Sequence, residues 1–326
     1  MQIRILGASG LKVTPIGIGL AGAGRPAYLG LGRDEDLGGE RSVDFLQRRT
    51  HELLDVAYEA GVRYVDAARS YGLAERFLGS WLKDRARTPG DPTVGSKWGY
   101  TYVGDWSIDA GVHEVKDHSL AALRRQYAES RAELGQNLNL YQIHSATLET
   151  GVLTNRAVLN ELARLKERGV AIGLSVSGPG QSDSIRQSLE ARIDGKRVFQ
   201  TVQATWNLLE RSAEAALAEA NQAGYGVIVK ESLANGRLTI RGDRAAGVLG
   251  EIAHRHEVNV DAVAIAAVLA NPWVHVVLSG AIAADQLASN LEALSVNLSR
   301  EELDALAALG EPSTTYWSHR QSSPWS

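Results

Sequence analysis

The chain has 326 residues, of which 44% are hydrophobic and 22% are charged, so it carries enough apolar side chains for a large buried core. A net charge of −4 and a pI near 6.1 argue against non-specific nucleic-acid binding, because such binding needs a basic face. The absence of cysteine excludes disulfides, thiolate metal sites and cysteine nucleophiles, as is common in cytosolic proteins.

The sequence has no recognisable targeting or membrane-spanning segment. Neither an apolar core nor a cleavage site follows Met1, as a secretory signal would require. The longest apolar run covers residues 262–270 and is closed by Asn271 and Pro272. It is too short to cross a bilayer and predicts a buried helix. We therefore expect a cytoplasmic protein without a membrane partner.

Short β-branched runs alternate along the chain with longer amphipathic stretches. Residues 3–13 predict a β-hairpin with a glycine-containing turn. The strand-like runs that follow end at Gly19, Asp66, Lys97, His144, Ser175, Gln203, Lys230 and Leu278. Stretches of helical period lie between them, at residues 51–60, 74–87, 119–134, 155–168, 212–223 and 284–294. Such alternation predicts parallel β-α units.

The number of these units predicts a closed α/β barrel. Most strand ends are separated by the length of one β-α unit, and no change of composition divides the chain. We expect a single (β/α)8-barrel (TIM-barrel) domain over residues 1–326, with the N-terminal hairpin closing its bottom, long β-α loops at its top and a C-terminal tail at 311–326. A Rossmann domain is the alternative, since residues 17–22 spell G-x-G-x-x-G. These glycines begin inside a strand, however, and no helix pattern follows them.

Four ionisable side chains stand at or just after the ends of three successive strands, where the β-α loops of a barrel meet. Asp66 ends one predicted strand, and Tyr71 follows it in the loop. Lys97 and His144 end the next two strands. Each residue alone has a structural explanation, such as a helix cap or a packed core side chain. Separate structural roles would not gather these four groups at one end of a barrel, so we interpret them as a candidate catalytic site.

This set of groups is suited to proton transfer at a carbonyl oxygen. A free phenol has a pKa of about 10, and a neighbouring ammonium such as Lys97 is expected to lower the pKa of Tyr71. Asp66 would hold that ammonium in place, and His144 would orient the substrate oxygen. The set contains neither a nucleophile nor a metal cage. Since no side chain can deliver hydride, a nicotinamide cofactor is implied.

Residues 61–72, with the sequence GVRYVDAARSYG, resemble the aldo-keto reductase superfamily signature around its catalytic aspartate and tyrosine. Ser96-Lys97 and residues 140–145 resemble the lysine and histidine segments of that family. The resemblance extends over about residues 10–310 and implies hydride transfer between nicotinamide and a carbonyl or alcohol. It also assigns roles: Tyr71 as general acid and base, Asp66 and Lys97 as the groups that tune it, and His144 as the group that orients the carbonyl.

The same resemblance implies a set of cofactor-binding positions. Ser175 and Gln203 match the carboxamide-binding residues, although Val176 replaces an asparagine found in many members. Lys230 stands where many members have an aromatic residue that stacks on nicotinamide. Its stem could pack there or its ammonium meet a phosphate, with Trp206 or Tyr225 as other aromatic candidates. The implied positions are Gly19, Leu20, Asp66, Ser175, Gln203, Lys230, Ser232, Leu233, Asn235, Gly236, Gly280, Gln286 and Asn290.

The cofactor is expected to be NAD(H) or NADP(H). Family members that bind a 2′-phosphate usually place Lys or Arg near the adenosine, because a dianion favours cationic partners. The corresponding positions here are Gly280, Ile282 and Gln286, and none of them is basic. We therefore predict no strong preference for NADPH, and no metal site.

Two other functions remain open at this point: a slow cofactor-binding regulatory subunit of the same fold, and a barrel lyase that uses Lys97 as a Schiff-base amine. The expected partner is a small carbonyl or alcohol, and the sequence specifies neither its identity nor the direction of reaction. The long loops at residues 20–41 and 98–116 are expected to form the rim of its pocket, with the aromatic residues Tyr28, Trp98, Tyr100, Tyr102 and Trp106.

Overall fold

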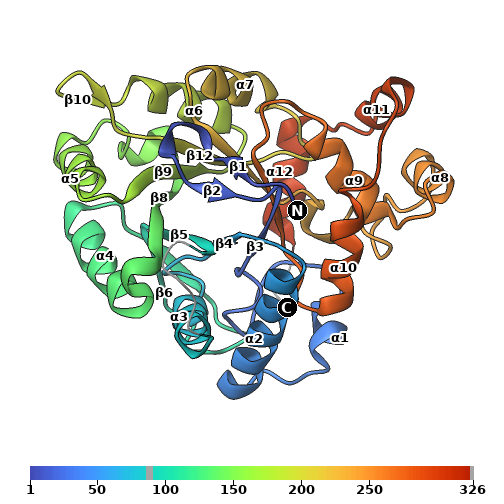
Figure 1. The fold of residues 1–326 in the computed structure, drawn as a ribbon, viewed down its shortest axis with the longest axis horizontal. Helices are drawn as coiled ribbons and strands as arrows, with labels where there is room; N and C mark the ends of the chain where they lie inside the picture. Colours follow the sequence, from blue (N-terminus) through green and yellow to red (C-terminus); the bar gives the residue numbers. More distant parts are fainter. Residues whose placement is uncertain (86–90, 324–326) are drawn as a thin grey trace.

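The computed structural model describes residues 1–85 and 91–323 and contains a closed barrel of parallel strands (Figure 1). β14 pairs with β3 and so closes the sheet. The predicted (β/α)8 barrel is confirmed, with all eight strands at the expected places. Around the barrel the strands are β3 (Ile16–Gly19), β4 (Tyr64–Asp66), β5 (Thr93–Trp98), β8 (Leu138–Ala146), β9 (Ala171–Val176), β12 (Thr201–Thr205), β13 (Gly226–Lys230) and β14 (Val276–Ser279).

Amphipathic helices cover the outside of the barrel and bury their apolar faces against it. α9 is apolar on all sides, as the run at residues 262–270 predicted, and is buried along almost its whole length. The helices of this layer are α2 (Val43–Glu59), α3 (Ala74–Asp84), α4 (Leu120–Leu134), α5 (Arg156–Glu167), α6 (Gln181–Glu190), α7 (Glu214–Gln222), α8 (Val248–Arg255), α9 (Val260–Leu269), α10 (Ala284–Glu292) and α11 (Arg300–Ala307).

The predicted helices are confirmed. Their observed ends differ most from the predicted ones where a polar cap determines the end. α2 begins eight positions before the predicted residue 51, because the Ser42 hydroxyl accepts the Phe45 amide and caps it. α3 ends at Asp84, and the predicted end at residue 87 lies outside the described residues. Helices α6, α8 and α11 were not predicted.

The N-terminal hairpin, β1 (Arg4–Ile5) with β2 (Lys12–Val13), lies across the bottom of the barrel (Figure 1, dark blue). Leu6 is fully buried there, and the Ala8 amide donates a 2.8 Å hydrogen bond to the Gly224 carbonyl. Gly7 has a φ of +50°, and a Cβ on it would overlap the backbone of Gly226. This close approach requires glycine at position 7. The predicted closure of the bottom by a hairpin is confirmed.

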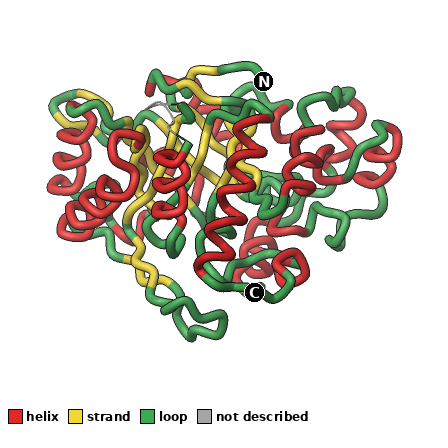
Figure 2. The backbone as a smooth tube through the Cα atoms, turned by 60° about the horizontal axis from the view of Figure 1, so that its bottom comes forward, coloured by secondary structure: helices red, strands yellow, loops and turns green. Residues whose placement is uncertain are grey.

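The opposite end of the barrel carries the long loops. The loop after β3 contains the short helix α1 (Arg33–Leu37). The loop after β5 contains an antiparallel hairpin, β6 (Tyr100–Tyr102) with β7 (Glu114–Lys116), which projects from the body of the molecule (Figure 2). Another small hairpin, β10 (Arg192–Ile193) with β11 (Lys196–Arg197), follows α6.

The predicted C-terminal tail contains a helix, α12 (Ser313–Ser322). Its Tyr316 and Trp317 side chains are buried and pack in a cluster with residues of α8, α9 and α11. The end of the tail, residues 324–326, lies outside the described part of the chain.

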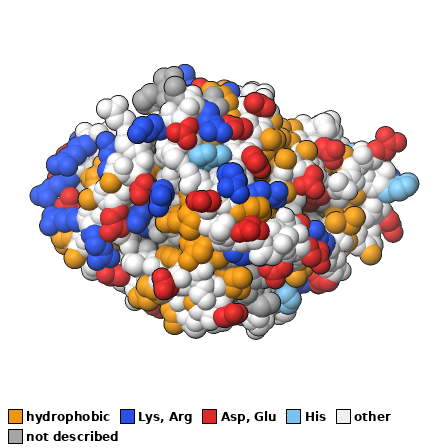
Figure 3. Space-filling model, turned by 90° about the horizontal axis from the view of Figure 1, so that it is seen from below, with side chains coloured by type: hydrophobic (Ala, Val, Ile, Leu, Met, Phe, Trp, Pro, Cys, Tyr) orange, Lys and Arg blue, Asp and Glu red, His pale blue; other side chains and the backbone are white. Residues whose placement is uncertain are grey.

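The surface carries mixed charge. The chain has 34 basic and 38 acidic residues, and the face shown in Figure 3 carries both kinds, with several basic side chains gathered at its left edge. Within residues 1–85 and 91–323, no helix is both long and apolar enough to cross a membrane.

Candidate active site

A cavity of about 900 Å³ opens at the carboxyl ends of the barrel strands, where the long loops meet. Of the four predicted catalytic residues, Asp66, Tyr71 and His144 line it directly. Lys97 lies just beneath this surface and is 1% exposed. The barrel therefore brings together all four side chains, although they come from three different strands and one loop.

Lys97 links Asp66 to Tyr71. Its Nζ forms a buried ion pair with the Asp66 carboxylate and donates to the Tyr71 hydroxyl at 3.2 Å and to the Ala67 carbonyl at 2.9 Å. These three acceptors match the three N–H donors of an ammonium. Because Lys97 can only donate, the Tyr71 oxygen accepts in this contact, and its own proton is left to face another acceptor.

The other carboxylate oxygen of Asp66 is held by a ring of donors at the top of the barrel. Gln203 donates to it at 2.9 Å, and Tyr64 and Gln142 each donate at 3.2 Å. A buried carboxylate is stable only when it is paired and hydrogen-bonded in this way. Asp66 thus fixes Lys97 from a rigid position, because its own orientation is determined by three strands.

The pKa of Tyr71 is raised well above its usual value of 10, first by burial and then by the charge of Asp66. The predicted net lowering by Lys97 is therefore wrong in this structure. Desolvation outweighs nearby positive charge, because Tyr71 is only 9% exposed. At neutral pH the side chain is a phenol and can donate a proton.

His144 packs its ring edge-on to that of Tyr71, with centroids 5.5 Å apart and an interplanar angle of 85°. Its Nδ1 contacts the Ser70 hydroxyl at 3.3 Å. Burial, followed by the charge of Lys97, lowers the pKa of His144 well below 6.5. The ring is thus neutral at physiological pH and can hydrogen-bond a substrate oxygen without charge repulsion from Lys97.

Most of the predicted cofactor positions lie on the same cavity. Leu20 and Ser175 do not line it: Leu20 is fully buried, and the Ser175 hydroxyl accepts the Ser145 amide at 2.9 Å. Leu20 therefore packs in the core, and the Ser175 hydroxyl bonds to backbone. The predicted positions that do line the cavity are Gly19, Asp66, Gln203, Lys230, Ser232, Leu233, Asn235, Gly236, Gly280, Gln286 and Asn290.

Lys230 ends β13 and donates to the Thr205 hydroxyl at 2.8 Å and to the Ser177 hydroxyl at 3.1 Å. Burial lowers its pKa to about 8. The next residue, Glu231, forms an ion pair of 2.6 Å with Arg320 of α12. Burial acts to raise the pKa of Glu231, but Arg320 and Lys230 outweigh it and hold that pKa at about 2.

At the end of the cavity near α10, side chains form contacts that the sequence did not predict. Gln286 donates to Asp36 of α1 at 2.7 Å, and Arg241 binds both oxygens of the same carboxylate, at 2.7 and 2.9 Å. Asn290 is held by Asp261 at 2.6 Å and by the Ser279 hydroxyl at 2.7 Å. A basic residue therefore does lie at this end, supplied by the loop after β13.

A model of the aldo/keto reductase family matches residues 34–311. The chain belongs to the aldo/keto reductase family. It is 26% identical to the aldo-keto reductase ausK of Emericella nidulans, over 95% of this chain and 82% of the relative. It is 25% identical to an aryl-alcohol dehydrogenase of Pestalotiopsis microspora, over 78% of this chain and 71% of the relative. An aldo-keto reductase structure from Bacillus halodurans has a TM-score of 0.72 at 22% identity, over 96% and 98% of the two chains, and supports the fold.

The aromatic residues of this aldo-keto reductase are placed only partly as predicted. Tyr28 and Tyr100 line the cavity, and Trp317 of α12 adds an unpredicted aromatic wall. Three other predicted rim residues, Trp98, Tyr102 and Trp106, do not line it. Trp98 is fully buried beside His118, and Trp106 packs on Phe77.

Neither Trp206 nor Tyr225, the other aromatic candidates for stacking on a nicotinamide, lines the cavity. Trp206 packs edge-on to Trp273, with ring centroids 5.5 Å apart. Tyr225 lies near the bottom of the barrel and donates to the Ser188 carbonyl at 2.9 Å. Neither candidate lines the cavity, because each ring is buried in the core.

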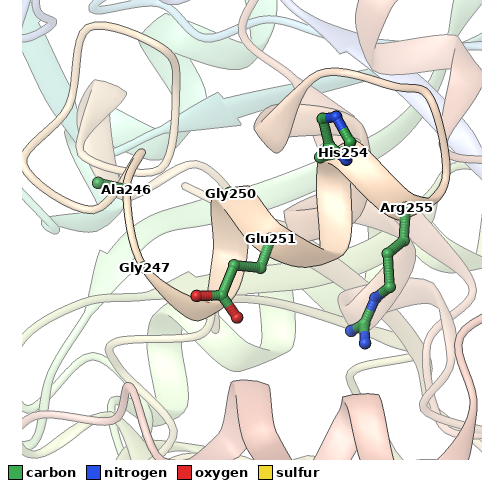
Figure 4. Close-up of a pocket in the computed structure, with 6 residues that line it drawn as sticks. All are labelled: Ala246, Gly247, Gly250, Glu251, His254 and Arg255. Carbon is green, nitrogen blue, oxygen red and sulfur yellow. The ribbon is translucent and has the colours of Figure 1, made fainter.

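The cavity-lining residues that sequence reasoning missed include Arg25, Glu231, Trp317 and Arg320, besides Asp36 and Arg241. A second hollow, of about 480 Å³, lies on α8 away from it, and Figure 4 shows its Glu251, His254 and Arg255 side chains. That hollow shares no residue with the barrel cavity.

Proposed function

We propose that this aldo-keto reductase transfers hydride between a nicotinamide cofactor and a carbonyl or alcohol, with Tyr71 as general acid and base. The observation that carries the proposal is the hydrogen bond from Lys97 to the Tyr71 hydroxyl beside the cavity, 3.2 Å long. It leaves the phenol proton free for a substrate oxygen. Proton donation of this kind contributes about 100- to 10,000-fold to a rate.

The residues of this chain divide the proton chemistry between them. In reduction, the Tyr71 phenol would give its proton to the carbonyl oxygen, and Lys97 would stabilise the phenolate that remains. The neutral His144 ring would hold the same oxygen in line. In oxidation the proton would return along the same path from the alcohol to Tyr71.

The cavity has features that suit a dinucleotide. A Cβ on Gly280 would meet no atom within 4 Å, so the backbone there offers room for close approach of a ligand. Ala281, Ile282 and Gln286 bring the start of α10 to the same wall, and a helix N-terminus favours phosphate. Lys230, Glu231, Ser232, Leu233, Asn235 and Gly236 line the same cavity. Bound there, NAD(P)(H) would supply or accept the hydride.

An aromatic substrate is the class we propose. Tyr28, Tyr100 and Trp317 line the cavity, and flat apolar groups pack well against aromatic side chains. The similarity to an aryl-alcohol dehydrogenase supports the same class. The Schiff-base alternative is disfavoured, because the Lys97 nitrogen is buried and already has three acceptors.

The proposal is tested by cofactor binding and turnover. We expect quenching of protein fluorescence by NAD(H) or NADP(H), followed by consumption of the cofactor with aryl aldehydes or alcohols. Sugar and aliphatic carbonyls complete the panel. Cofactor binding without turnover of any substrate would instead favour a regulatory subunit, and the absence of binding would contradict the proposal.

A further inference from the structure

Arg25 places a second cation against Tyr71. It lies in the loop after β3, is 2% exposed, and its guanidinium carbon is 5.1 Å from the centroid of the Tyr71 ring. The same guanidinium lies 4.8 Å from the ring of Tyr28. Lys97 donates to the hydroxyl of the phenol, and its Nζ lies 4.7 Å from the ring centroid, so Arg25 is a second cation against a ring that Lys97 already contacts. The phenol is therefore contacted by two positive charges, one from strand β5 and one from the loop after β3.

The position of Arg25 is determined by the fold. Its Nε donates to the Ala21 carbonyl at 3.1 Å and its Nη1 to the Ser70 carbonyl at 3.2 Å. The Glu114 carboxylate of β7 forms an ion pair with it. These contacts hold the guanidinium against the ring. They compensate for the considerable rotamer entropy that an arginine side chain loses when it is fixed in one position.

The loop after β3, which holds Arg25, and the loop after β4, which holds Tyr71, approach each other so closely that both need glycine. A Cβ on Gly24 would overlap the Tyr71 carbonyl, and a Cβ on Gly72 would overlap the Gly24 carbonyl and lie 2.9 Å from the Cβ of Arg25. Gly72 also has a φ of +59°. The backbone around Tyr71 is thus fitted to the backbone around Arg25, and a larger residue at either glycine would separate them.

We propose that Arg25 is a positioning residue that stabilises the phenolate form of Tyr71 through its ring face. A cation over an aromatic face is attracted by the ring, and a negatively charged ring strengthens that attraction. Burial of the pair increases the interaction, because little water screens it. Arg25 would so offset part of the cost of ionising a buried phenol.

The charges that face Tyr71 from the surrounding elements make this compensation necessary. Burial comes first in raising the pKa of Tyr71, followed by Asp66 of β4, with smaller contributions from Glu114 of β7 and from Glu231, which follows β13. Arg25 acts in the opposite direction. Lys97 on β5 donates to the hydroxyl, and His144 on β8 is neutral. Tyr28 is held as a phenol by burial, which raises its pKa.

The inference rests on the proposed function, in which Tyr71 accepts the proton of the alcohol during oxidation. In that step the alcohol O–H bond breaks, an O–H bond forms on the Tyr71 oxygen, and the hydride leaves carbon for the nicotinamide. The phenolate must exist before the step. Loss of the Arg25 charge should therefore displace the rising limb of the oxidation pH profile to higher pH.

The test compares Arg25→Met with Arg25→Lys in the full chain, using kcat/KM for alcohol oxidation across pH. We expect the limb of the methionine variant to move up by about one pH unit, the size of a desolvated cation–π contact. The limb of the lysine variant should move by less than half as much. Arg63→Met is the matched control, since Arg63 lies 3.8 Å over the ring of Tyr58 outside the cavity, and its profile should not move.

Two further variants make each outcome decisive. In Arg25→Met the Glu114 carboxylate is left without its partner, so the second variant combines Arg25→Met with Glu114→Gln. A shift of the rising limb that persists in this double variant is caused by the loss of the Arg25 charge. An unshifted limb, or equal shifts for methionine and lysine, would overturn the inference. Tyr71→Phe with wild-type turnover would overturn the proposed function instead. If Arg25→Met fails to fold by circular dichroism, Arg25→Gln is used in its place with the same expected shift.

Discussion

The side-chain amide of Gln286 on α10 donates a 2.7 Å hydrogen bond to Asp36 on α1, two residues that are 250 positions apart in the chain. Arg241 binds both oxygens of the same carboxylate. The acid lies at the end of the cavity where an adenosine would be held if NAD(P)(H) binds as proposed. There the carboxylate would repel a 2′-phosphate, and it already pairs with the Arg241 guanidinium. The contact therefore supports the prediction that NADPH is not strongly preferred.

Asp36→Asn should change cofactor preference. Removal of the carboxylate frees the Arg241 guanidinium, and a phosphate dianion is its natural partner. We expect the ratio of NADPH to NADH affinity to rise about tenfold, which is about 1.4 kcal/mol. Fluorescence titration with both cofactors measures it. Asp34→Asn on the same short helix is the control, since Asp34 is 67% exposed and pairs with Arg41. A ratio unchanged by Asp36→Asn would contradict this assignment.

Tyr71→Phe should abolish most of the activity without unfolding the protein. The substitution removes the proposed proton donor and keeps the ring against His144, so we expect kcat to fall about 100- to 10,000-fold. Tyr225→Phe is the matched control, because its hydroxyl only bonds the Ser188 carbonyl in the core. That variant should lose about 1 kcal/mol of unfolding free energy and keep its kcat. Steady-state kinetics and urea unfolding separate the two effects.

Glu231 should make stability depend on acid pH. Its pKa in the folded protein is about 2, below the usual 4.5, because Arg320 and Lys230 outweigh its burial. A carboxylate with a depressed pKa stabilises the folded state above its unfolded pKa, and the contribution disappears as pH falls from about 4.5 to about 2. The contribution is of the order of 3 kcal/mol. Urea unfolding of wild type and Glu231→Gln over this range should converge at the acid end; parallel curves would contradict the ion pair.

Gly7→Ala should destabilise the bottom of the barrel and leave the site intact. The new methyl would overlap Gly226 and strain a φ of +50°, so we expect a loss of about 2 kcal/mol or more. Gly10→Ala is the matched control, with a φ of +72° and no atom within 4 Å of the added Cβ. Its smaller loss, about 1 kcal/mol, measures backbone strain alone. Thermal unfolding measures both, and kcat per folded molecule should not change in either variant.

The barrel and the grouping of Asp66, Tyr71, Lys97 and His144 at one end of it could be predicted from sequence, because both follow local patterns. β-branched runs mark the strands, and the carboxyl end of each strand has a fixed place in a barrel. Asp66, Lys97 and His144 therefore had to lie together. The side-chain bonds of Lys97 with Asp66 and Tyr71 agree with that expectation.

The walls of the cavity could not be predicted in the same way. Arg320 reaches Glu231 across 89 positions, and the loop that holds Arg25 has no periodic pattern. Trp98 carried a misleading signal, because an aromatic residue at a strand end can face either the core or the cavity. The pKa of Tyr71 was misjudged because the extent of burial is a property of the packed structure and not of neighbouring residue types.

The placement of α12 decides where the protein can be modified for practical work. The last described helix contributes Trp317, Arg320 and Gln321 to the cavity wall, whereas Met1 lies beside Gly61 at the closed end. Figure 2 shows the two chain ends on opposite sides of the molecule. An affinity tag or surface attachment at the N-terminus keeps the cavity mouth open to substrate, and a fusion at the C-terminus brings its bulk to that mouth.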